Sequence, residues 1–185
     1  MQKIKRMPSP KTKQVVLGVC GSIAAYKAGD IIRRLQDAHC EVTVIMTREA
    51  ERFITPLTLS SLSGRAVHSD MFDKDSWRMA HIELARSAEL VLIAPATANV
   101  IGKLANGVSD DLLTTFVITT RAPIFIAPAM NDEMYANRIV KDNCAKLKKY
   151  GFKFIEPVKG KLACGTTGIG HLAEVEDIVG VVAKW

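Results

Sequence analysis

Short, continuous apolar runs alternate along the chain with segments of helical periodicity, and this alternation restricts the fold more than any other feature. The runs are rich in β-branched residues and cover residues 15–19, 42–46, 90–94, 124–127 and, more weakly, 152–155. Continuous rather than alternating apolar runs are typical of strands that are covered on both faces. We therefore predict an α/β fold, a single-domain doubly wound parallel sheet of the Rossmann-like type with right-handed crossovers.

Two of the intervening segments have clear helical signals. In residues 24–35, Ile31, Ile32 and Leu35 share one face of a helix. Residues 133–150 end in a basic last turn and are followed by Gly151, a combination that is typical of a helix end. We predict one helix in each segment.

The length and composition indicate one globular domain. We expect residues 1–13 to form a disordered basic leader and residues 14–185 to form the domain. The net charge of +6 favours small anionic ligands, because the basic residues are scattered and aromatic residues are few, unlike a nucleic-acid surface. The four cysteines form no CxxC pair, which argues against a metal site. With no secretory signal and no membrane-spanning apolar run, we expect a cytoplasmic protein without a membrane partner.

In doubly wound sheets ligands bind beyond the carboxyl ends of the strands, so the residues there are the first candidates. The first strand leads into GSIAAYK at residues 21–27, where Gly21 permits a tight turn and Ser22 can cap a helix. The second strand ends near Thr47. Since the dinucleotide fingerprint GxGxxG is absent, a mononucleotide phosphate fits better than a pyrophosphate. Taken alone, the motif is equally well explained as an ordinary strand-to-helix turn.

Polar residues also follow the next two strands. Thr97 and Asn99 can bind a ligand or cap the helix that follows, and capping is the commoner role. Asn131 lies in PAMNDEM at residues 128–134 and leaves the same two possibilities open, with the helix cap favoured on composition alone.

Two further side chains have the chemistry of proton transfer. Cys164 lies in the glycine-rich loop 160–170, where its thiol is either a proton donor or nucleophile, or a buried loop anchor. His81 begins a helical segment and is either an acid–base group or an ordinary surface or capping residue.

Read together, these motifs resemble the flavin-containing cysteine decarboxylases, and within them the branch that acts on phosphopantothenoylcysteine in coenzyme A biosynthesis. The resemblance covers about residues 14–180. Its carriers occur in one order along the chain, at residues 21–27, 53–57, 81–84, 94–99, 128–134 and 163–165. So many motifs in one order make the match more specific than a likeness of fold.

The resemblance implies a role for each matching position. His81 and Cys164 match the catalytic residues, Asn131 matches the amide that grips the substrate carboxylate, and Met130 and Met134 shape the substrate pocket. The cofactor FMN would be held by Gly21, Ser22, Ile23, Thr47, Phe53, Thr97, Ala98, Asn99, Val100 and Ala129.

The resemblance also implies the chemistry. Oxidised flavin takes two electrons from the thiol carbon, and the resulting thioaldehyde allows the neighbouring carboxylate to leave as CO2. Cys164 then protonates carbon while reduced flavin returns hydride. The substrate is a small phosphorylated cysteine conjugate, and the family's active site lies between subunits of a homotrimer or an assembly of trimers.

Three other groups remain to be weighed. The peptidyl-cysteine decarboxylases stop at the enethiol and do not need the reducing cysteine, so ACG at residues 163–165 favours the small-molecule branch. Flavin prenyltransferases lack the PAMN motif. Non-catalytic regulatory relatives depend on long acidic extensions, which this sequence does not have. One departure is His171, which stands where many relatives have arginine.

Overall fold

A single parallel sheet organises the computed structural model, which describes residues 12–72, 80–161, 165 and 167–185. Its strands are β1 (Lys13–Val19), β2 (Cys40–Met46), β3 (Val67–His68), β4 (Leu90–Ala96), β5 (Ile124–Pro128) and β6 (Lys153–Phe154). They lie in the order β3-β2-β1-β4-β5-β6, and every neighbouring pair is parallel. The predicted doubly wound parallel sheet is therefore confirmed.

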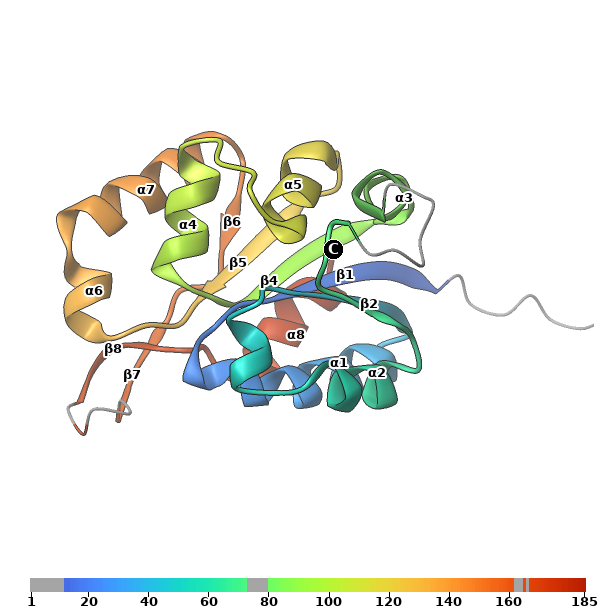
Figure 1. Ribbon diagram of the computed structural model, residues 1–185. Helices are drawn as coiled ribbons and strands as arrows, with labels where there is room; N and C mark the ends of the chain where they lie inside the picture. Colours follow the sequence, from blue (N-terminus) through green and yellow to red (C-terminus); the bar gives the residue numbers. More distant parts are fainter. Residues whose placement is uncertain (1–11, 73–79, 162–164, 166) are drawn as a thin grey trace, which may run out of the picture.

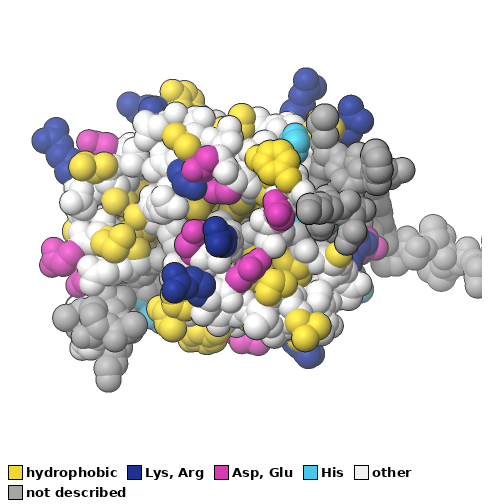
Figure 2. All heavy atoms as spheres, in the orientation of Figure 1, with side chains coloured by type: hydrophobic (Ala, Val, Ile, Leu, Met, Phe, Trp, Pro, Cys, Tyr) yellow, Lys and Arg dark blue, Asp and Glu magenta, His cyan; other side chains and the backbone are white. Residues whose placement is uncertain are grey.

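Helices cover both faces of this sheet (Figure 1). On one face lie α1 (Ala28–Asp37), α2 (Pro56–Ser63) and α8 (Val175–Ala183). On the other lie α3 (Ala80–Ser87), α4 (Ala98–Ala105), α5 (Leu112–Thr119) and α7 (Arg138–Lys149). Figure 2 shows basic and acidic side chains interspersed over the face that it presents. No helix in the described part of the chain is both long and apolar enough to cross a bilayer.

The two helical layers explain why the strand sequences are continuously apolar. Leu17 and Leu92 are fully buried in the cluster that includes α1 and α8, whereas Val16 and Ile93 point into the cluster that includes α4 and α5. Because successive side chains of a strand point to opposite faces, each central strand needs apolar residues at every position.

The first predicted helix is present, with its first turn as a 3-10 helix, whereas the second is divided. The segment 24–35 begins as the 3-10 helix η1 (Ile23–Lys27) and continues as α1. The segment 133–150 is divided into α6 (Asp132–Ala136) and α7. The division falls at Asn137, whose backbone is not helical and whose side-chain oxygen accepts a hydrogen bond of 2.9 Å from the Ile139 amide. A single continuous helix was thus wrong, because an internal asparagine caps a second one.

The C-terminal third contains an element that the sequence did not predict. Strands β7 (Val158–Lys161) and β8 (Thr167–His171) pair as an antiparallel hairpin that overlaps the segment 160–170, which was expected to be a glycine-rich loop. Cys164 and the other residues of 162–164 lie outside the described residues. In Figure 1 the hairpin extends from the carboxyl edge of the sheet, beside α6.

The strand order places a crevice between β1 and β4. The chain runs outward from β1 to β2 and β3, and then returns to the other side of β1 to continue with β4 and β5. The loops after β1 and β4 consequently leave the sheet in opposite directions, and the gap between them is where open α/β sheets bind their ligands.

Candidate functional site

A cavity of about 670 Å³ lies at the carboxyl edge of the sheet, between the loops that follow β1, β4 and β5. Its volume is within the range of small-molecule sites. The walls come from four places in the sequence: the η1 turn, the start of α4, the start of α6, and the end of β8. The lining residues are Gly21, Ser22, Ile23, Ala24, Tyr26, Lys27, Thr97, Ala98, Asn99, Ala129, Met130, Asn131, Met134, Gly170, His171 and Leu172.

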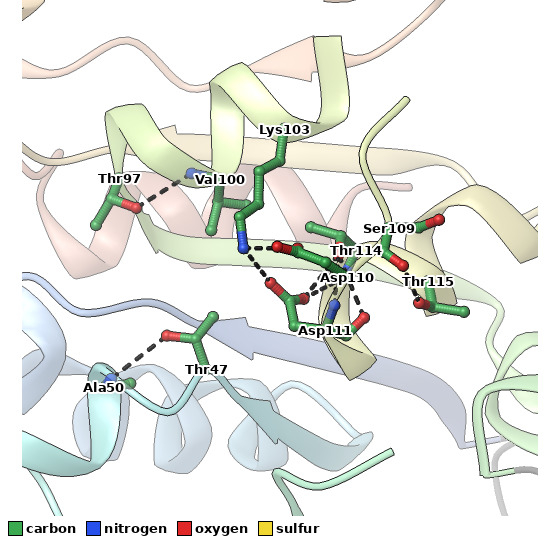
Figure 3. Close-up of polar contacts among 10 residues, drawn as sticks. All are labelled: Thr47, Ala50, Thr97, Val100, Lys103, Ser109, Asp110, Asp111, Thr114 and Thr115. Atoms are coloured by element: carbon green, nitrogen blue, oxygen red, sulfur yellow. Dashed lines mark hydrogen bonds and ion pairs between the residues drawn. The ribbon is translucent and has the colours of Figure 1, made fainter. Parts of the chain in front are cut away.

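The first wall consists of the η1 turn and the first turn of α4, and we call it the cofactor wall because most of the residues predicted to hold FMN lie on it. Ser22 caps η1 by accepting a hydrogen bond of 3.3 Å from the Ala24 amide, and Thr97 caps α4 by accepting one of 3.4 Å from the Val100 amide (Figure 3). Two helix N-termini thus meet at one cavity. Their amide groups and their dipoles favour an anion such as a phosphate.

The turn after β1 depends on a glycine for close packing. A Cβ atom at Gly21 would lie 2.4 Å from the Cβ atom of Glu49 and 3.0 Å from its carbonyl carbon. The loop after β2 therefore packs directly against this turn, and no larger residue fits there without moving one of the two loops.

An ion-pair cluster connects α4 to the residues that precede α5. Lys103 Nζ lies 2.7 Å from Asp110 Oδ1 and 2.9 Å from Asp111 Oδ2, and Asp111 also caps α5 through the Thr114 amide (Figure 3). Burial acts to raise the pKa of Asp111, but the hydrogen bonds from Thr114 and Lys103 outweigh it and hold the pKa below its ordinary value. The helix that begins at the cavity is therefore tied to the start of the next helix.

The second wall consists of the α6 N-terminus and the end of β8, and we call it the substrate wall because the residues predicted to contact the substrate lie on it. Asn131 Oδ1 caps α6 by accepting hydrogen bonds of 3.0 Å from the Glu133 amide and 3.4 Å from the Met134 amide. The helix cap, one of the two possibilities left open for Asn131, is therefore present, and the same residue also lines the cavity. Its side-chain oxygen is used by the cap, while its NH2 group has the donor chemistry that a carboxylate requires.

Basic side chains enter the cavity from two sides. Lys27 lines it from η1 and lies 3.7 Å from the carboxylate of Glu174. His171 lines it from β8, with Nδ1 2.9 Å from the carbonyl oxygen of Leu172. Because a carbonyl only accepts, Nδ1 carries the proton in this contact, and Nε2 is the other polar atom of the ring.

Most of the residues predicted for the site are brought together by the fold. Those that line the cavity are Gly21, Ser22, Ile23, Thr97, Ala98, Asn99, Ala129, Met130, Asn131 and Met134. Three other predicted cofactor residues lie outside its lining. Thr47 is buried at the end of β2, where its hydroxyl oxygen accepts a 3.3 Å hydrogen bond from Ala50 (Figure 3). Val100 is buried in α4, and Phe53 is half-exposed after the short helix η2 (Ala50–Arg52).

Of the two predicted catalytic residues, only His81 falls within the described part of the chain. His81 is the second residue of α3, which packs against α5, and it does not line the cavity. Its Nδ1 atom is buried and has no hydrogen-bond partner among the described residues. Cys164 lies outside them. Cys20, Cys40 and Cys144 are buried, and burial raises the pKa of Cys20 to about 12, so these thiols are poor proton donors.

Six lining residues were missed as site residues, although four of them lie in segments that the sequence had marked as candidates. Ala24, Tyr26 and Lys27 belong to the segment 21–27, where helical periodicity did not show which side faces a ligand, and Gly170 belongs to the segment 160–170. The glycine-rich composition marked 160–170 without showing that it pairs as a hairpin. The missed residues are Ala24, Tyr26, Lys27, Gly170, His171 and Leu172.

A sequence model of one family, described as flavoprotein, matches residues 3–185. The chain belongs to the flavoprotein family. Two curated relatives of this flavoprotein are the bifunctional coenzyme A biosynthesis protein CoaBC of Bacillus subtilis, 48% identical over 93% of the chain, and a probable phosphopantothenoylcysteine decarboxylase of Streptococcus mutans, 44% identical over 91%. The chain spans 43% of the length of the first and 96% of the second.

Solved structures agree with this assignment. One is a mutant PPC decarboxylase complexed with pantothenoylaminoethenethiol, which has a TM-score of 0.85 and 32% identity, with 93% of this chain and 97% of that chain covered. Another is the FMN-binding protein AtHal3, with a TM-score of 0.83, 34% identity and coverage of 93% and 95%. The flavoprotein thus shares both fold and sequence with them.

The residues of the cavity fit a flavin mononucleotide. The capped N-termini at Ser22 and Thr97 suit one phosphate group, and apolar side chains such as Ile23, Ala98 and Ala129 suit a flat ring system. Metal ligation has no comparable support, because no three His, Cys, Asp or Glu side chains gather within the described ranges.

Proposed function

We propose that this flavoprotein is an FMN-dependent decarboxylase that converts phosphopantothenoylcysteine to phosphopantetheine, in the cytoplasm and as a step of coenzyme A biosynthesis. The observation that carries the proposal is one cavity with two kinds of wall. The cofactor wall has the N-termini that a mononucleotide phosphate needs, and the substrate wall holds the amide of Asn131. The names of the relatives support the same substrate.

FMN would be held by the cofactor wall together with Ala129, which follows β5. The amides that follow Ser22 and Thr97 would bind its phosphate, and Ile23, Ala98 and Ala129 would contact its apolar parts. When bound, the flavin supplies two-electron oxidation and reduction of the carbon that carries the thiol. The protein orients the substrate against it and controls the protons.

Asn131 would orient the substrate. Its NH2 group would donate to the carboxylate that leaves as CO2, while its oxygen remains fixed by the α6 cap. Met130 and Met134, whose thioether side chains line the same wall, would pack against the apolar part of the substrate. The helix cap thereby fixes the amide before the substrate arrives, which is the preorganisation that catalysis by orientation requires.

His81 and Cys164 would complete the proton chemistry. His81 would pair with the reacting carboxylate, and Cys164 would donate the proton that reaches carbon in the last step. A thiol suits that role because its ordinary pKa, about 8.5, is far lower than the pKa of a hydroxyl group.

We further propose that the site is completed by a second copy in a homotrimer or an assembly of trimers. His81 does not line the cavity of its own chain, yet the proposed chemistry needs it there. Apolar side chains that line the cavity are also exposed, since Ile23, Tyr26 and Met134 are 59%, 61% and 48% exposed. A neighbouring subunit would cover these side chains and bring its own His81 to them.

The cofactor and the reaction are tested together with purified protein. We expect a yellow protein that releases FMN rather than FAD, and that liberates CO2 from phosphopantothenoylcysteine. Protein that cannot be reconstituted with FMN would contradict the cofactor, whereas FMN-loaded protein that liberates no CO2 would contradict the substrate.

The shared site is tested by mixing two inactive variants. His81→Asn and Asn131→Asp should each abolish turnover, but co-expressed mixed oligomers should regain a fraction of it, because some cavities then combine both wild-type residues. The control is His39→Asn, at a left-handed position (φ 59°) that asparagine tolerates, which should remain active. Mixed oligomers that are as inactive as the two single variants would contradict a shared site. His81 and Asn131 would then act within one subunit, or not in the active site at all.

A further inference from the structure

Two segments of the substrate wall meet backbone to backbone, and Gly170 is the residue at their contact. We propose that Gly170 is a positioning residue: the absence of its side chain sets the distance between β8 and the turn that carries Asn131. This inference rests on the proposed function, because it assigns to that contact the placing of the substrate amide. The residues of this contact all lie within the described part of the chain.

The contact leaves no room for any side chain at this position. A Cβ atom at Gly170 would lie 2.2 Å from the carbonyl oxygen of Met130, and 3.2 Å from the carbonyl carbon of Asn131 and the amide nitrogen of Asp132. All of these are backbone atoms, which no rotamer change can move. The Met130 amide also donates a hydrogen bond of 3.0 Å to the carbonyl oxygen of Gly170. We call this contact the Gly170–Met130 seam.

A second glycine on β8 makes a softer contact with the same turn. A Cβ atom at Gly168 would lie 2.1 Å from Asp132 Oδ2, 2.5 Å from its Cβ and 2.6 Å from its Cγ. Here the obstructing atoms belong to a side chain on the first turn of α6. The clash of a larger residue at position 168 can therefore be relieved by removing the Asp132 side chain. A clash at position 170 cannot be relieved in this way, because it involves backbone atoms.

Helix α6 is also hydrogen-bonded to the segment that precedes the hairpin. The Tyr135 hydroxyl of α6 donates a 2.5 Å hydrogen bond to Glu156, which precedes β7 and also accepts a 2.6 Å bond from Lys148 Nζ. The short helix α6 is thus attached to the segment before β7 through Tyr135 and to β8 through the seam. Because it is attached at both places, this five-residue helix has little freedom to move relative to the hairpin.

The seam matters for the substrate because it joins the two halves of one wall. Gly170, His171 and Leu172 line the cavity from β8, while Met130 and Asn131 line it from the turn. Moving β8 outward by the space of a methyl group would change the position of Asn131 relative to the cavity but would leave the cofactor wall at Ser22 and Thr97 unchanged. A misplacement of about 1 Å can cost up to 100-fold in rate.

The test compares glycine-to-alanine variants of the full chain with bound FMN. Gly170→Ala should raise KM for phosphopantothenoylcysteine by about tenfold or more, with little change in FMN content. Gly180→Ala is the matched control, since nothing lies within 4 Å of a Cβ atom there, and it should behave as wild type. The exchange protection of the Met130 amide should fall about tenfold or more in Gly170→Ala alone, because its hydrogen bond to β8 is strained.

The second glycine provides an internal check. Gly168→Ala should raise KM less than Gly170→Ala does, and Gly168→Ala combined with Asp132→Gly should return toward the value of Asp132→Gly alone. The same Asp132→Gly change should not rescue Gly170→Ala. A Gly170→Ala protein with wild-type KM and a fully protected Met130 amide would overturn the inference. The amide exchange reports on the seam even if the wild type fails to turn over this substrate, a result that would contradict only the proposed function.

Discussion

The two walls of the cavity are built in different ways. The cofactor wall follows directly from the ends of β1 and β4, central strands held by hydrogen bonds on both sides. The substrate wall consists of the start of a five-residue helix and the end of a two-stranded hairpin, whose described residues pair with no strand of the central sheet. The first wall is thus positioned by the sheet, whereas the second is positioned by a few contacts between short elements outside the sheet.

This difference predicts where a single substitution does damage. In the cofactor wall, one lost contact leaves the strand ends in place, because the surrounding ladder and the buried core still hold them. In the substrate wall, each contact fixes a large share of the geometry. Changes of similar size should therefore have unequal effects on the two sides of the cavity.

The largest effect is expected for Asn131→Asp. Aspartate still caps α6, so the fold and bound FMN should be retained, but it replaces a donor by a carboxylate that repels the substrate carboxylate. We expect kcat/KM to fall by about 100-fold to 1,000-fold or more, on the scale of losing one preorganised donor. The measurement is steady-state turnover of phosphopantothenoylcysteine.

The matched control for this change is Asn137→Asp. Asn137 caps α7 in the same way, through a 2.9 Å bond from the Ile139 amide, and does not line the cavity. It should keep near-normal turnover. Near-normal turnover of Asn131→Asp as well would reduce Asn131 to a helix cap.

The smallest effect is expected behind the cofactor wall, for Asp111→Asn. Asparagine keeps the α5 cap but loses the charge that pairs with Lys103, so the free energy of unfolding should fall by about 0.5–1 kcal/mol at pH 7. Because the folded-state pKa of Asp111 lies below its ordinary value, the contribution of its charge is present above that ordinary value and is lost as pH falls through the folded-state pKa. FMN content should not change.

Urea unfolding of wild type and Asp111→Asn, at neutral pH and again near pH 3, checks this difference. The gap between the two proteins should narrow in acid. A gap that is equally large at both pH values would assign the effect to the cap rather than to the ion pair. Loss of FMN from this variant would contradict the view that the sheet alone positions the cofactor wall.

The sequence predicted the two walls unequally for the same physical reason. Ser22, Thr97 and Asn131 were found because capping chemistry is local and follows directly after an apolar run. The parallel sheet followed from the continuous apolar strands. Gly170 and His171 were missed as lining residues because their positions depend on pairing between β7 and β8 and on contacts with Met130, which lies 40 positions earlier in the chain.

The helix division at Asn137 marks a different limit. Asparagine within a stretch of good helix formers is tolerated in some helices and ends others, and the choice here depends on tertiary contacts. Tyr135, two residues earlier, donates a hydrogen bond to Glu156, which lies outside both helices. Periodicity alone could not distinguish these outcomes.

The most direct test of the central claim is the mass of the product formed from phosphopantothenoylcysteine by wild type and by Cys164→Ser. We expect the wild-type product to be lighter by one CO2 and to be the ordinary saturated thiol. Cys164→Ser should lose the same CO2 yet release a product two hydrogens short, with the flavin absorption bleached, because serine cannot supply the final proton. Unchanged substrate with FMN-loaded wild type would contradict the account, and a wild-type product two hydrogens short would assign the chain to the peptide-maturing branch instead.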